Sequence, residues 1–142
     1  MLDKVGRDEM HYKIAHINIK EIENKEDVLK AMKKIKNPNF QDKQGVSYLH
    51  MACQAHSIEA VSLLLELGAD PNINDDKDFS PIMSAIGRIN ENNSAIFELL
   101  LQHGLDLDKK EGNMTLKEMI ESFDEEELNN IMRKYAVSEE LK

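Results

Sequence analysis

The chain repeats one arrangement of apolar and polar positions twice. Residues 57–70 (SIEAVSLLLELGAD) and 94–106 (SAIFELLLQHGLD) are both leucine-rich helical stretches that end at a glycine, where a helix can stop in left-handed backbone. A shorter stretch precedes each of them, at 47–52 (SYLHMA) and 80–85 (SPIMSA). Ala52 and Ala85 are 33 positions apart, whereas Leu63 and Leu99 are 36 apart. The pattern predicts two units of two helices, with three extra residues between the helices of the second, within 87–93.

Weaker copies of the same pattern flank these two units. Residues 37–39 (NPN) lie 33 positions before 70–72 (DPN), and 112–116 (GNMTL) resembles 45–49 (GVSYL). We therefore expect one domain over residues 8–135. Its units are a degenerate N-terminal repeat at 8–41, repeats at 42–74 and 75–108, and a C-terminal capping repeat at 109–135. Residues 136–142 are expected to form a flexible tail.

Helix-start signals agree with this division. Ser80 followed by Pro81 is typical of an N-cap and the first helical position. Thr115 with Glu118 three residues later predicts a capping box. Asp124, followed by three glutamates, is predicted to cap the last helix.

A period of 33 built from a turn and two helices resembles the ankyrin repeat. The best copy has Leu49, His50 and Ala52 in its first helix and ends at residues 68–70 (GAD), but it has Tyr48 where the family usually has proline. The next copy has the proline but replaces the histidine with Met83 and the turn glycine with Asp78. The resemblance implies an all-α solenoid of about four repeats, including degenerate end caps. It also implies that His50 is structural and bridges backbone groups of adjacent repeats.

Composition narrows the class of partner. The chain has 27 acidic and 18 basic side chains, a net charge of −9, which disfavours binding to nucleic acid. A basic protein is the natural complement, although the charge is equally explained by solubility alone. A single cysteine, no leader and no long apolar run predict a reduced, cytoplasmic protein that does not bind a membrane.

No motif predicts catalysis, a metal or a cofactor. The spacings of His11 and His16, and of His50 and His56, differ from the four residues that place two imidazoles on one helix face. The oxygen-rich run at 72–78 lacks the glycine and the closing glutamate of a calcium loop. We expect a protein that is not an enzyme and holds neither metal nor cofactor.

The resemblance implies binding through hairpin tips and the exposed side of each first helix. Phe40 and Phe79 have an alternative role as half-buried packing residues of the hairpins. The partner-binding residues expected on this basis are Phe40, Gln41, Lys43, Gln44, Val46, Gln54, Ala55, Asp76, Lys77, Phe79, Gly87, Arg88, Lys110 and Asn113.

Three classes of function remain open at this point. The leading hypothesis is a monomeric, non-catalytic module that binds another protein. Small ankyrin proteins of this kind resemble bacterial immunity proteins, so a dedicated inhibitor of a basic toxin enzyme is its specific form. The alternative is an adaptor or effector scaffold with several weaker partners. An enzyme or metal-dependent protein is disfavoured by the missing motifs.

Overall fold

The computed structural model describes residues 4–88 and 90–140. In chain order the elements are α1 (Glu9–Ala15), α2 (Lys25–Met32), α3 (Tyr48–Gln54), α4 (Ile58–Glu66), α5 (Pro81–Ile86), α6 (Asn93–Gln102), β1 (Lys110–Glu111), β2 (Met114–Thr115), α7 (Leu116–Ser122) and α8 (Glu126–Glu140). Within the described ranges, no helix is both long enough and apolar enough to cross a lipid bilayer.

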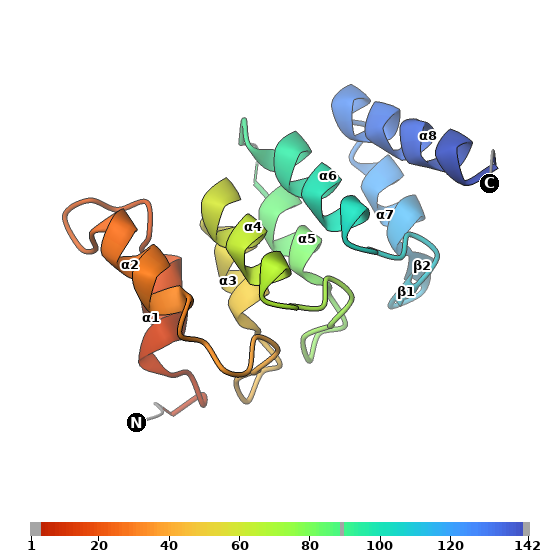
Figure 1. Ribbon diagram of the computed structural model, residues 1–142. Coiled ribbons are helices and arrows are strands. Elements are labelled where there is room, and N and C mark those ends of the chain that lie inside the picture. Colours follow the sequence, from red (N-terminus) through yellow and green to blue (C-terminus); the bar gives the residue numbers. More distant parts are fainter. Residues whose placement is uncertain (1–3, 89, 141–142) are drawn as a thin grey trace.

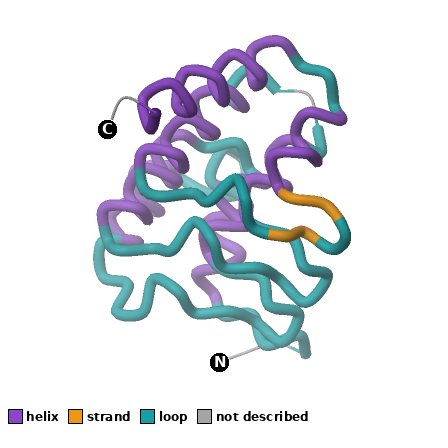
Figure 2. Tube along the Cα trace, turned by 90° about the vertical axis from the view of Figure 1, so that its right-hand side faces the viewer, coloured by secondary structure: helices purple, strands orange, loops and turns teal. Residues whose placement is uncertain are grey.

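Four helix pairs stack into a helical solenoid, as the sequence predicted (Figure 1). The first helices α1, α3 and α5 pack side by side, and α2, α4, α6 and α8 form a second layer beside them. The long connections between pairs gather on one side of the molecule (Figure 2). The first and last pairs lie at opposite ends of the stack, so each pair contacts only its neighbours.

Each repeat contributes apolar side chains to one continuous core. Leu64 and Leu100 are fully buried in α4 and α6, and Leu63 and Leu99 beside them are half-buried. The small residues Ala52 and Ala85 are also fully buried, where α3 and α5 pack against each other. Cys53 is a free, fully buried thiol in α3. Because neighbouring pairs share this core, no repeat buries its apolar face alone.

Capping side chains fix most helix starts. Thr115 and Glu118 form the predicted capping box at α7. Ser80 is the N-cap of α5 with Pro81 at the first position, as predicted, but its side chain makes no cap hydrogen bond. The prediction that Asp124 caps α8 is wrong. Asp124 has left-handed backbone (φ 53°) in the turn after α7, and Glu125 O accepts from Asn129 N–H at 3.0 Å, one residue before α8 begins.

Three equivalent hairpin positions need left-handed backbone. Gly45, Asp78 and Gly112 have φ of 77°, 70° and 72°. A Cβ on Gly45 would lie 2.8 Å from Asp76 N, so only glycine fits there. Asp78 tolerates the conformation and uses its carboxylate, whose Oδ2 accepts from Gly112 N–H at 3.0 Å. The last hairpin is regular enough to form the antiparallel pair β1–β2.

The C-terminal boundary differs from the sequence expectation. Helix α8 continues to Glu140, so residues 136–140, expected to belong to a flexible tail, are helical. The sequence has no glycine or proline after Gly112, and nothing local therefore ends the helix at residue 136. Residues 141–142 of that expected tail lie outside the described residues.

Candidate functional site

Hydrogen bonds between neighbouring hairpins fix the tips in register. Asp76 N–H donates to Gln44 O at 2.8 Å, which joins the first tip to the second. The Gln41 side chain donates to Gly45 O at 2.8 Å and to Asn74 O at 3.1 Å. Lys109 Nζ donates to Asn72 O at 2.5 Å from the third connection. The row of tips is therefore a bonded structure rather than a set of independent loops.

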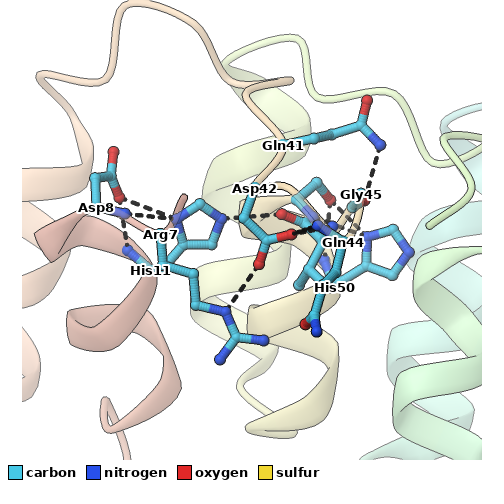
Figure 3. A network of polar contacts seen from close by, with 10 residues as sticks. Arg7, Asp8, His11, Gln41, Asp42, Gln44, Gly45 and His50 are labelled. Carbon is cyan, nitrogen blue, oxygen red and sulfur yellow. Dashed lines mark hydrogen bonds and ion pairs between the residues drawn. The ribbon is translucent and has the colours of Figure 1, made fainter. Parts of the chain in front are cut away.

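A buried carboxylate organises the first hairpin (Figure 3). The Asp42 side chain is fully buried and accepts from the N–H groups of Gln44 at 2.8 Å and Val46 at 2.9 Å. Its other oxygen accepts from Arg7 Nε at 2.8 Å. This hydrogen bond raises the pKa of Arg7 despite partial burial. Arg7 thus carries a fixed guanidinium at the junction of the N-terminal segment and the hairpin.

Three histidines bond to backbone carbonyls of the next repeat. His11 Nε2 lies 2.9 Å from Val46 O, His50 Nε2 lies 3.0 Å from Phe79 O, and His56 Nε2 lies 2.9 Å from Ala85 O. The structural role that the resemblance implied for His50 matches this geometry. In the part of the chain that the structure describes, no three His, Cys, Asp or Glu side chains gather to hold a metal ion.

The repeat at 75–108 has no histidine at the position of His50, and a different side chain accepts the hydrogen bond at the start of its first helix. At α3, the N–H of Ser47 donates to His50 Nδ1 at 3.2 Å. At α5, Met83 occupies the position of His50, and the N–H of Ser80 donates to Glu111 Oε1 at 3.0 Å. Glu111 is buried in β1 of the following repeat. Sequence analysis missed this role because the two residues are 31 positions apart.

Most of the residues expected to bind a partner lie on the surface. Phe40 is half-buried and packs against His11 and Tyr48, with ring centroids 5.6 and 6.0 Å away, as its packing alternative predicted. Val46 and Ala55 are also half-buried. Phe79 is 37% exposed. The exposed residues of the set are Gln41, Lys43, Gln44, Gln54, Asp76, Lys77, Phe79, Gly87, Arg88, Lys110 and Asn113.

Several of these residues meet in a trough along the first helices. Two adjoining hollows, of about 310 and 470 Å³, share Arg7, Gln54 and Arg88. We call their combined surface the trough. The hollow nearer the hairpins also has Val46, His50, Asp75, Ser84 and Gly87. The other hollow also has Tyr12, Ala15, His16, Asn18, Ile19, Met51, Ala55 and His56.

The trough includes residues that sequence analysis missed, chiefly Arg7, Tyr12 and Ser84. Of the residues expected to bind a partner, it includes Val46, Gln54, Ala55, Gly87 and Arg88. The expected residues on the hairpins lie outside it: Phe40, Gln41, Lys43, Gln44, Asp76, Lys77, Phe79, Lys110 and Asn113. A larger hollow of about 570 Å³ lies beside the loop between α1 and α2. Residues 17–26 alone line it, whereas three repeats contribute to the trough. The trough is therefore the better candidate for a site that depends on the stacked fold.

Comparisons with known proteins agree with this architecture. A family model described as ankyrin repeats (3 copies) matches residues 15–111. An ankyrin repeat protein of Acanthamoeba polyphaga mimivirus is 33% identical over 110 residues, which are 75% of this chain and 14% of the viral protein. One from Fowlpox virus (strain NVSL) is 42% identical over 48 residues, 34% of this chain and 8% of that protein.

A solved structure has the same fold. The crystal structure of an ankyrin repeat domain from Acinetobacter baumannii AYE superposes with a TM-score of 0.75 at 17% identity, and covers 91% of this chain and 64% of that one. The chain spans only a small part of its viral relatives' length. On the family match and the stacked helix pairs, the chain belongs to the ankyrin repeat family.

Proposed function

We propose that this chain binds a partner protein through its hairpin tips and the exposed side of its first helices. Ankyrin repeats are in general non-catalytic modules that mediate protein–protein interaction. The observation that carries the proposal is the bonded row of hairpins. Asp76 N–H donates to Gln44 O at 2.8 Å between neighbouring tips, while the side chains of Lys43, Gln44 and Lys77 remain exposed.

A fixed row of tips favours binding on energetic grounds. Ordering a flexible loop on association costs conformational entropy, and a surface that is already ordered avoids this cost. The backbone of the first tip is held by the Asp42 carboxylate, and that of the second by Asp75, whose Oδ1 accepts from Lys77 N–H at 2.9 Å and Phe79 N–H at 3.0 Å. Phe79 offers a partly exposed aromatic ring, the residue type enriched at binding hot spots.

The finer form of the proposal is a dedicated inhibitor, of the immunity-protein kind, for a basic enzyme. The net charge of −9 supports it, because opposite charge accelerates the encounter of two proteins at low ionic strength. An adaptor with several weaker partners is the alternative. Raising the salt concentration should slow association with a basic partner steeply, whereas the association rate of a neutral or acidic partner should not fall.

Affinity capture from a lysate of the native cells tests the proposal. The parent chain is compared with a hairpin variant, Lys77→Ala with Phe79→Ala, both exposed in the second tip. The matched control is Lys33→Ala with Phe123→Ala, exposed residues outside the hairpin row. One stoichiometric partner lost by the hairpin variant and kept by the control is the expected result. Equal capture by all three proteins would place the binding surface elsewhere.

A further inference from the structure

The trough has a different charge character from the rest of the molecule. Among the described residues that line it, Asp75 is the single acidic side chain, although the chain has 27. Helices α3 (YLHMACQ) and α5 (PIMSAI), which form its centre, contain no aspartate, glutamate, lysine or arginine. The acidic excess is therefore carried by other parts of the surface.

The charges inside the trough are two guanidinium groups and one carboxylate that is already engaged. Asp75 accepts two hydrogen bonds from the backbone of its own hairpin. Arg7 is bonded to the buried Asp42 at 2.8 Å, so that its charge is largely offset. Arg88 is exposed, and its guanidinium makes no hydrogen bond or ion pair with any residue that the structure describes. Arg88 therefore leaves a local positive charge at the trough.

Apolar surface continues from these charges toward the other end of the first helices. Tyr12 and Ile19 are each 41% exposed and line the same hollow as Arg88. Buried Met51 of α3 also lines this hollow. A segment lying along the trough thus meets a guanidinium group and an apolar patch within one continuous surface.

We propose that the trough binds an extended segment of the partner that has an acidic side chain beside Arg88 and an apolar side chain against Tyr12 and Ile19. The argument is charge complementarity, because a carboxylate is the matching ligand for a guanidinium fork. The inference rests on the proposed function and adds the chemistry of the docking segment. The acidic side chain of the segment would contact Arg88 at short range, whereas the net charge of −9 acts while the two proteins approach each other.

A display selection tests this segment chemistry directly. A phage library of random peptides of about twelve residues is selected on the purified chain, on Arg88→Glu and on Lys33→Glu. Lys33→Glu makes the same charge change at an exposed residue at the end of α2, a helix that contributes nothing to the trough. Peptides enriched on the parent and on Lys33→Glu should combine acidic and apolar residues. The acidic preference should disappear on Arg88→Glu.

A synthetic copy of the most enriched peptide gives the quantitative readout. Replacing the acidic residue that pairs with Arg88 by its amide should weaken binding to the parent about fivefold, the scale of one partly exposed ion pair. The same replacement should not weaken binding to Arg88→Glu, where a carboxylate would face another carboxylate. Enriched peptides that are basic, or that bind equally to Arg88→Glu, would overturn the inference, as would no enrichment at all. Partner capture by the hairpin variant would still decide the proposed function separately.

Discussion

Helices α3 and α5 of neighbouring repeats both have a serine as the N-cap residue, but the N–H groups of the two serines have different hydrogen-bond acceptors. At α3, the N–H of Ser47 donates to His50 Nδ1 at 3.2 Å within the same turn. At α5, the N–H of Ser80 donates to Glu111 Oε1 at 3.0 Å, from the following repeat. The acceptor at α3 therefore belongs to the same helix, whereas the acceptor at α5 belongs to the following repeat.

The difference shows how a repeat can lose a consensus residue and keep its helix start. His50 also reaches forward to Phe79 O, so one ring both caps its own helix and contacts the next repeat. Met83 can do neither, because its thioether lacks a donor and is a weak acceptor. Glu111, which belongs to the following repeat, provides the acceptor for the N–H of Ser80. The α5 start consequently depends on the last repeat being folded, which couples the two units.

The largest effect should come from breaking the interface that α3 and α5 share. Ala52→Asp or Ala85→Asp places an unpaired charge at a fully buried position, which should cost about 3–5 kcal/mol of unfolding free energy. Because the two alanines are equivalent, the two losses should be similar. Urea denaturation measures both, with Ala95→Asp on the exposed side of α6 as the control. A midpoint unchanged by Ala52→Asp would refute the repeat register.

The next effect tests the local cap. His50→Ala removes the acceptor for Ser47 N–H and the group bonded to Phe79 O, and should lower the free energy of unfolding by about 2 kcal/mol. His50→Gln retains an amide that can donate and accept, and should recover part of this loss. Denaturant midpoints of the two variants provide the measurement. Equal losses in both would mean that the ring acts through packing alone.

A smaller effect tests the cap supplied by the neighbour. Glu111→Ala should cost about 1 kcal/mol, because the lost acceptor for Ser80 N–H is partly balanced by removal of a buried carboxylate. Met83→His should recover most of it by providing the acceptor that His50 provides in α3.

A double-mutant cycle between Glu111→Ala and Met83→His gives the coupling energy directly. The expected value is about 1 kcal/mol, stabilising when both changes are present. Strict additivity of the two changes would show that Glu111 does not substitute for the missing histidine.

The smallest effect is a difference in pH dependence. Burial lowers the pKa of His50, although the bond to Phe79 O and the charges of Asp75, Asp42 and Glu111 oppose this. The folded state therefore holds the neutral ring, and the unfolded chain binds more protons below about pH 6.5. The contribution of His50 to the free energy of unfolding is fully present above that pH and decreases as the pH falls.

We expect this pH dependence at α3 and not at α5, because the equivalent residue in α5 is Met83, which does not titrate. Unfolding free energies at about pH 7 and about pH 5 should differ less for His50→Gln than for the parent. Met83→Ala is the matched control and should keep the parental difference. Identical pH slopes in the parent and in His50→Gln would contradict the assignment.

The fold was predictable because its evidence is repeated along the chain. The cap at Thr115 and the glycine-ended helices depend on residues close in sequence, where the physics is local. The 33-residue spacing of Ala52 and Ala85 then shows that these local signals recur from one repeat to the next. The error at Asp124 arose where this local evidence is degenerate. Four acidic residues follow one another there, and each is favoured in the first turn of a helix, so the sequence does not mark one start. The turn after α7 selects the left-handed conformation for Asp124, which moves the helix start to Glu126.

The trough was predictable only in part. Val46, Gln54, Gly87 and Arg88 follow from the repeat register and do line it. Arg7 lies before the first expected repeat, and its position depends on an ion pair with a residue 35 positions away. Contacts over that distance are set by the stacking of helices and have no local signal. The same reason hid the role of Glu111.

Cys53 gives the molecule an internal chemical reporter. Its side chain is fully buried in α3, and burial raises the pKa of its thiol, so that the reactive thiolate is scarce in the folded state. A thiol reagent can modify it only after α3 separates from its neighbours. The labelling rate of the unmodified chain therefore measures how often the middle of the solenoid opens. No engineered cysteine is needed, because the sequence contains one thiol.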